Sequence, residues 1–252
     1  MFKKSIILFS LGIMLSCNAS KGKFTPNPAA PGFNQEGSDA RAIQIADEVM
    51  QAQGGRGAWD AVRYISWNFF GSRKLLWDKF TGNVRIDWLK KSQNVIVNIQ
   101  TGQGKVMLDN VVQTNPDTIL KYVEIGKKVW INDSYWLVMP YKLKDSGVTL
   151  KYIGEGKTEA GLNADILQLT FAGVGVTPDN KYHIWVDKTA KLVRQWAFFE
   201  KFSTEKPNFI SPWDDYKTAA PIPVMFSGSR GKDRSLEPVE TPKEVPPGTF
   251  DF

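Results

Sequence analysis

The chain has 252 residues, with 32 Lys and Arg, 26 Asp and Glu, one His and one Cys. One His and one Cys are too few for a zinc site of the usual kind, and a single Cys excludes an intramolecular disulfide. The net charge of +6 is mild and no long basic run is present, so nucleic-acid binding is not expected. Aromatic residues make up 12% of the chain, which excludes a disordered protein and predicts a sizeable core.

The amino end predicts an export signal over residues 1–16. Lys3 and Lys4 give it a positive start, and an apolar stretch from Ile6 to Leu15 follows. This stretch is shorter than the roughly 20 apolar residues that span a bilayer, and no other window reaches that length. We therefore expect a cleaved signal and no transmembrane helix.

The single cysteine, Cys17, directly follows this segment. The run Met14-Leu15-Ser16-Cys17 resembles a bacterial lipoprotein box, in which a small residue precedes the modified cysteine. The resemblance implies a diacylglycerol on Cys17 and an acylated amine, which together would anchor the protein firmly. It places the protein in the envelope of a Gram-negative bacterium, at the outer membrane, facing the periplasm or the surface. An ordinary secretory signal with an incidental cysteine is the alternative.

The next segment, residues 17–38, is rich in Lys, Gly, Asn and Pro and predicts a flexible tether. The folded domain is expected over residues 39–227. Its first element is a helix over 39–53 with Ser38 as N-cap, because apolar residues recur there at helical spacing until Gly54-Gly55 end it. A short second segment over 58–62 leads into the sheet.

From residue 63 the apolar period changes to two. Ile65, Trp67 and Phe69 form one face of the first run, and similar alternation continues to residue 108. Short turns such as Thr81-Gly82-Asn83 separate the runs. Successive short strands joined by tight turns predict an antiparallel meander and not βαβ units.

One helical insert interrupts the strands over residues 115–140. Asn115 is the expected cap and Pro116 suits the first helical position. Gly126 can divide the insert into two helices, and Pro140 ends it. One stripe of the insert is apolar and contains Ile119, Val123, Trp130 and Leu137.

A second series of alternating runs covers residues 148–226. Residues 228–252 are proline-rich and predict either a floppy tail or an edge strand, where proline is tolerated. In total the pattern predicts about nine to eleven strands in a mainly β (α+β) fold. We expect a curved antiparallel half-barrel whose concave side is closed by the N-terminal helix and the helical insert.

Residues that could carry catalysis are few and scattered. His183 lies on the same strand face as Trp185 and is expected to be a surface or rim residue, not a base or a metal ligand. Asp214 and Asp215 are adjacent, so in a strand they point to opposite faces and cannot act as a pair. No nucleophile elbow, phosphate-binding loop or dinucleotide motif is present. We therefore predict no catalytic residue, no metal site and no cofactor, and expect a binding protein that is not an enzyme.

The nine tryptophans are the most informative feature. Most of them must pack in the core, but a curved sheet with one helical insert can also enclose an apolar pocket. The residues expected to line such a pocket are Trp67, Trp88, Trp130, Trp136, Leu137 and Met139.

One run resembles a known family. The segment from Tyr135 to Val148, with the sequence YWLVMPYKLKDSGV, resembles a hallmark of a Bacteroidetes family of uncharacterised envelope lipoproteins. Gly54-Gly55 before Ala58-Trp59 is similar to that family too, and the resemblance covers about residues 39–226 in element order. The wider group resembles the half-barrel of the LolA/LolB-type lipoprotein carriers, which implies a cavity for acyl chains. No residue of this chain matches a known functional position of the carriers.

These observations predict a lipid-anchored protein that binds a lipid, an acylated protein or another apolar ligand in its cavity. Two alternatives remain. A glycan-binding surface lipoprotein would carry Trp and Tyr on an exposed platform, and a protein-interaction module of an envelope complex would have a filled core and an exposed apolar patch.

Overall fold

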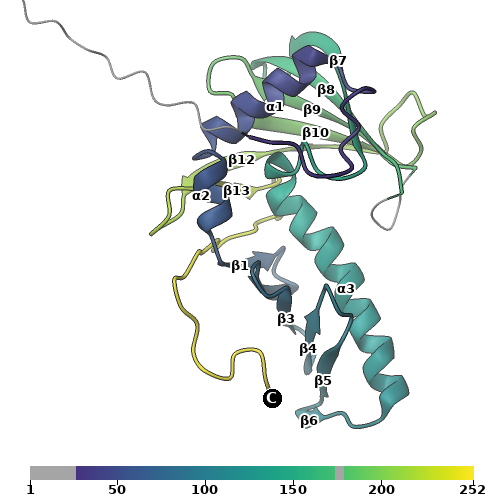
Figure 1. Cartoon of the computed structure of the whole chain (residues 1–252), viewed down its shortest axis with the longest axis vertical. Coiled ribbons are helices and arrows are strands. Elements are labelled where there is room, and N and C mark those ends of the chain that lie inside the picture. The colour runs from purple at the N-terminus through teal and green to yellow at the C-terminus, as the bar shows by residue number, and fades with distance from the viewer. Residues whose placement is uncertain (1–26, 174–178) are drawn as a thin grey trace, which may run out of the picture.

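The computed structural model describes residues 27–173 and 179–252 (Figure 1). The predicted signal, Cys17 and part of the tether therefore lie outside the described residues. Within the described ranges, no helix has the length and apolar character that crossing a membrane requires. The fold is mainly β, with antiparallel sheets that are open and a few helices, in agreement with the predicted class.

A six-stranded sheet occupies the lower part of Figure 1. Its neighbouring strands are all antiparallel and follow each other in chain order, which confirms the predicted meander. Gly82 and Gly102 lie in two of its turns with φ values of +77° and +74°, a conformation that glycine adopts without steric cost. The strands are β1 (Tyr64–Phe69), β2 (Arg73–Asp78), β3 (Asn83–Trp88), β4 (Gln93–Asn98), β5 (Gly104–Leu108) and β6 (Val111–Val112).

A five-stranded sheet in the order β11-β10-β9-β8-β7 forms the upper part, and β12 pairs with β13 in a two-stranded ribbon between the two (Figure 1). The described residues thus hold thirteen strands in three sheets, where about nine to eleven strands in one half-barrel were predicted. The excess arises because β6, β11 and β12 have two, four and five residues, too few for a clear alternation. The strands are β7 (Val148–Lys157), β8 (Asn163–Phe171), β9 (Lys181–Asp187), β10 (Val193–Phe199), β11 (Phe209–Pro212), β12 (Asp214–Thr218) and β13 (Met225–Ser229).

The first helix, α1 (Ala40–Ala52), packs on the five-stranded sheet, and the short α2 (Arg56–Ala61) follows it. The predicted N-cap is wrong, because Asp39 holds that position and no side chain caps the helix. The Ser38 hydroxyl instead accepts a hydrogen bond of 3.0 Å from the backbone N–H of Leu150, and the Asp39 carboxylate accepts one of 2.9 Å from Tyr152. Both side chains therefore fasten the start of α1 to β7.

The helical insert is a single helix, α3 (Pro116–Val138), followed by the short 3-10 helix η1 (Met139–Tyr141). The Asn115 side chain accepts a hydrogen bond of 3.0 Å from Thr118 N–H, which confirms the predicted cap. The proposed division at Gly126 is wrong. A Cβ atom at Gly126 would lie 2.9 Å from Cγ1 of Val95, so this glycine allows α3 to approach β4 closely.

Two hydrophobic cores result. The first lies between the six-stranded sheet and α3, and the second lies between the five-stranded sheet and α1. Trp136, near the end of α3, packs against both cores. An ion pair of 2.7 Å between Arg73 of β2 and the buried Asp133 of α3 fixes the helix against the first sheet just before it reaches the second.

The C-terminal segment is ordered along the first sheet. Ser66 of β1 and Glu240 exchange two backbone hydrogen bonds of 2.9 Å, and Leu236 is fully buried. Further on, Arg85 of β3 donates to the Thr249 carbonyl oxygen at 3.1 Å. Of the two predictions for residues 228–252, the edge strand is therefore closer to the structure, although the pairing is limited to isolated bridges.

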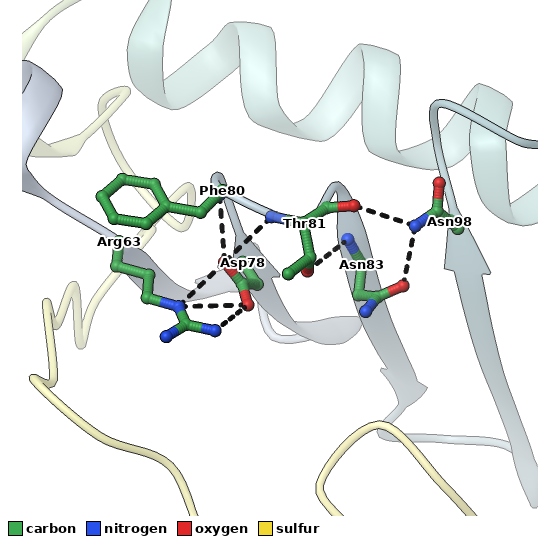
Figure 2. Close-up of polar contacts among 6 residues, drawn as sticks. All are labelled: Arg63, Asp78, Phe80, Thr81, Asn83 and Asn98. Atoms are coloured by element: carbon green, nitrogen blue, oxygen red, sulfur yellow. Dashed lines mark hydrogen bonds and ion pairs between the residues drawn. The ribbon is translucent and has the colours of Figure 1, made fainter.

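A polar cluster closes the turn between β2 and β3 (Figure 2). Asp78 is buried, and its carboxylate accepts hydrogen bonds from the backbone N–H groups of Phe80 and Thr81 and from the Arg63 guanidinium. Asn98 extends the cluster to β4, since it donates to the Thr81 carbonyl oxygen at 2.9 Å. Burial by itself raises the pKa of Asp78, but these donors outweigh it and lower the pKa below its usual value.

Candidate functional site

A cavity of about 360 Å³ lies where the end of α3 meets the five-stranded sheet. Its walls come from three parts of the chain: the last turns of α3, the connection from α3 to β7, and strands β8 to β10. A volume of this size is within the range of small-ligand sites. The lining residues are Trp130, Ile131, Asn132, Ser134, Tyr135, Trp136, Lys142, Asp145, Ser146, Val148, Phe171, Tyr182 and Trp196.

Aromatic rings form most of the wall. Trp136 meets Trp196 edge-on at 4.5 Å between ring centroids, and Tyr182 stacks on Trp196 at 5.0 Å. Tyr135 contacts Tyr182 at 5.7 Å and Phe171 at 6.2 Å. Pairs at these separations stabilise one another, so the wall is a connected group of rings with few rotatable bonds.

Strand alternation explains why the sheet contributes these rings. Tyr182 is on the β9 face that also carries the buried Ile184 and Val186, and Trp196 faces the same core from β10. α3 contributes two consecutive rings because Tyr135 turns toward the second core, while the neighbouring Trp136 lies between the two cores. The cavity therefore borders the second core, and Trp130, which packs against the first core, completes its wall.

A buried arginine, Arg230, contacts the residues that hold this aromatic wall in place. Arg230, just after β13, is 1% exposed and donates to the Trp136 carbonyl oxygen and, at 2.7 Å, to the Ser229 carbonyl oxygen. Its guanidinium carbon lies 3.4 Å from the ring centroid of Trp213, and Trp213 packs edge-on against Trp196 at 5.2 Å. Arg230 thus connects the end of α3 to the ring that the sheet contributes.

The polar part of the lining carries no net charge. Lys142 and Asp145 are the charged residues of the lining, and they form an ion pair with each other. Asn132, Ser134 and Ser146 complete the polar part of the lining. A single carboxylate neutralised by its neighbour provides no acid–base pair of the kind that hydrolysis requires.

Among the lining residues, Tyr135 is the unusual one. Its hydroxyl oxygen is buried and has no hydrogen-bond partner in the described part of the chain. Burial raises the pKa of Tyr135 well above its usual value, so the hydroxyl stays protonated and keeps its donor. The indole N–H groups of Trp130 and Trp196, which also line the cavity, are buried without a partner too.

The structure brings only part of the predicted lining together. Trp130 and Trp136 do line the cavity. Trp67 and Leu137 are buried in the first core, Met139 is buried in the second, and Trp88 packs against the first core. These four residues do not border this cavity, because Trp67 and Trp88 belong to the other sheet and Leu137 and Met139 are packed inside the two cores.

The prediction missed Tyr135, Phe171, Tyr182 and Trp196 as lining residues. The last three have the correct alternation for an inward face, but alternation does not tell which inward residues border an empty volume. Tyr135 had a local signal, since it precedes Trp136 in the same distinctive run.

The candidate catalytic residues lie elsewhere. His183 is on the opposite face of β9 from Tyr182, where it is hydrogen-bonded to Gln168 at 3.2 Å and packs on Phe199 at 4.7 Å. Burial lowers its pKa, and the nearby Lys181 ammonium lowers it further. Asp214 and Asp215 are both exposed on β12. Among the residues that the structure describes, no three His, Cys, Asp or Glu side chains gather as a metal site.

No protein-family model matches the chain, and no curated protein matches it. Among solved structures, a DUF1329 family protein from Desulfovibrio piger ATCC 29098 is 12% identical with a TM-score of 0.45, over 83% of this chain and 97% of that one. MucB in complex with MucA(peri) is 13% identical with a TM-score of 0.24, over 82% of this chain and 66% of that one. Both similarities are too low to assign a family or a function to this chain.

Proposed function

We propose that this chain is a lipid-anchored envelope protein whose folded part binds an apolar ligand, such as a lipid or an acylated protein, without catalysis. The observation that carries the proposal is the cavity of about 360 Å³ with its aromatic wall. Burying an apolar ligand there contributes about 0.8 kcal/mol for each CH₂ group removed from water, so binding needs no charged contact. The two sheets around α3 would then act as the open half-barrel of a LolA/LolB-like protein of the Bacteroidetes lipoprotein family.

The distribution of tryptophans favours this proposal over a glycan platform. All nine tryptophans lie in the described ranges, and each is buried or partly buried. A platform for sugars would expose several of them side by side. The large apolar residues that are exposed are mostly aliphatic, such as Leu89, Val111 and Leu162, and they include no tryptophan.

The test uses the full chain with Cys17→Ala, which cannot be lipidated, and the same chain with the further substitution Val148→Phe. Val148 is 3% exposed and lines the cavity, so a phenyl ring there occupies ligand space. Both proteins are purified under mild conditions, extracted with organic solvent and analysed by mass spectrometry.

We expect a near-stoichiometric apolar molecule from the Cys17→Ala protein and much less from the Val148→Phe protein. A clean Cys17→Ala protein that also fails to take up a fluorescent fatty acid would overturn the proposed function. The anchor is tested separately, because the unmodified chain should sediment with membranes and the Cys17→Ala chain should not.

A further inference from the structure

The size and the wall of the cavity limit the kind of ligand, and this step rests on the proposed function. We propose that the cavity takes a single unbranched chain of about twelve carbons from an amphiphile without net charge, such as a lysophospholipid. The polar head stays at the exposed part of the lining. A second acyl chain finds no space, so the cavity does not select diacyl lipids or lipoproteins with several chains.

The volume sets the length of the chain. An apolar cavity of about 150 Å³ holds one benzene molecule, which has six carbons. At the same density of packing, the cavity of about 360 Å³ at the end of α3 holds roughly twelve to fourteen carbons. The two chains of a membrane diacyl lipid exceed this volume, so at most one of them is buried.

Rings outside the lining hold the wall in place and keep this volume fixed. Phe209 stacks on Trp136 at 5.8 Å between ring centroids, and Trp213 packs edge-on against Trp196 at 5.2 Å. Neither Phe209 nor Trp213 lines the cavity. Moving Trp136 or Trp196 aside to admit a second chain would break these contacts, so widening the cavity costs free energy.

The exposure of the lining residues gives the chain a direction. Asn132 and Ser146 are the exposed residues of the lining, and both are polar. The partly exposed ion pair of Lys142 and Asp145 lies on the same connection as Ser146 and adds no net charge. Val148, by contrast, is buried. A chain that enters with its apolar end first therefore leaves water, while an uncharged or zwitterionic head keeps its hydrogen bonds to water and to the exposed residues.

The experiment measures dissociation constants by displacement of a fluorescent fatty acid from the full chain with Cys17→Ala. The probes are saturated lysophosphatidylcholines from octanoyl to hexadecanoyl in steps of two carbons. Didecanoylphosphatidylcholine is compared with the decanoyl member of the series. Each probe is used below the concentration at which it forms micelles.

Two variants make the same substitution inside and outside the cavity. Val148 is buried and lines the cavity, whereas Val111 is 62% exposed on β6 and does not line it. Because phenylalanine is larger than valine, the ring in Val148→Phe should take the space of about four ligand carbons. Val111→Phe is the matched control.

We expect affinity to rise about tenfold for each two added carbons up to a length limit of about twelve carbons, and by less than about twofold per step beyond it. Val148→Phe should move this limit to about eight carbons, and Val111→Phe should leave it in place. Didecanoylphosphatidylcholine should bind less than about tenfold more tightly than its single-chain counterpart, whereas burial of its whole second chain would add several powers of ten.

An affinity that keeps rising up to the hexadecanoyl probe, or a gain of more than about tenfold from the second chain, would overturn the single-chain limit and leave the proposed function intact. An unchanged limit in folded Val148→Phe protein would also overturn it, because the chain would then bind outside this cavity. The limit in the unsubstituted cavity and the diacyl comparison do not depend on the folding of either variant.

The remaining outcomes separate the inference from the proposed function. If the fluorescent fatty acid binds and no lysophosphatidylcholine displaces it, the inference fails and the proposed function stands. If neither the fatty acid nor any of the lipid probes binds, the proposed function itself fails, and the inference fails with it.

Discussion

The middle and the end of α3 meet the two sheets in opposite ways. Near its middle, Gly126 has no side chain and the helix settles onto Val95 of β4, so that the first core is filled. At its end, Tyr135 and Trp136 meet Phe171, Tyr182 and Trp196 of the second sheet, and a volume of about 360 Å³ stays open. The same helix therefore packs closely on the first sheet at Gly126 and borders an open cavity at Tyr135 and Trp136.

The difference teaches that aromatic content does not by itself indicate a pocket. Trp67 and Trp77 are as large as the rings around the cavity, but they are buried in the core where their sheet packs directly against α3. Large rigid side chains leave a gap where several of them converge from different elements and cannot interdigitate. The filled core and the hollow core should then respond differently to substitution.

The largest effect is expected in the filled core. Trp67 is 1% exposed, and Trp67→Ala should lower the free energy of unfolding by about 3–5 kcal/mol, because the lost contacts leave a cavity that the sheet cannot close. Urea denaturation measures the change, with Leu89→Ala, at a position 51% exposed, as the control. A loss below about 1 kcal/mol would mean that this core is not tightly packed.

The connection between the two regions comes next. Arg230→Met should lower the free energy of unfolding by about 2–4 kcal/mol, since the carbonyl oxygens of Ser229 and Trp136 lose their charged donor. It should also weaken ligand binding, because Trp136 and Trp213 lose their common support. Arg234→Met, at an exposed position nearby, is the control for loss of charge. Unchanged stability together with unchanged binding would show that Arg230 does not hold the wall.

A pair of matched substitutions compares the two cores directly. Val95→Phe should cost about 1–3 kcal/mol or more, because Val95 already touches α3 at Gly126. Val148→Phe should change the free energy of unfolding by less than about 1 kcal/mol, because the new ring has space in the cavity. Thermal or urea unfolding of both variants gives the answer. Equal costs at the two sites would contradict a difference in packing between the cores.

The smallest effect concerns the polar turn of the filled region. The pKa of Asp78 in the folded protein is below its usual value of 3.8, so its ionised form stabilises the fold above that pH. Asp78→Asn should cost about 1–2 kcal/mol near pH 7, because the buried hydrogen bonds lose their charge.

This cost should decrease as the pH falls below about 4 and the wild-type carboxylate takes up a proton in the folded state. Unfolding curves of both proteins at several pH values test the sign. Asp215→Asn, at an exposed position, is the control for loss of a carboxylate. A cost that grows on acidification would contradict the assignment.

The sequence by itself determined the local structure. The period of two predicted the meander over residues 64–108, and Asn115-Pro116 predicted the start of α3. Where local signals failed, a tertiary contact had replaced them. The Ser38 hydroxyl does not cap α1 and instead accepts a hydrogen bond from Leu150 of β7. Gly126 does not interrupt α3, and its missing side chain lets the helix lie close to Val95 of β4.

The cavity depended on tertiary structure to a greater extent. The sequence indicated Trp130 and Trp136 as lining residues, because an amphipathic insert must face the sheets. It could not tell that Trp67 lies in the first core and Met139 in the packed part of the second core, while Tyr182 and Trp196 border an open volume. Alternation determines which face of a strand is buried, but only the distance between packed elements decides whether the space that they enclose is filled by their own side chains.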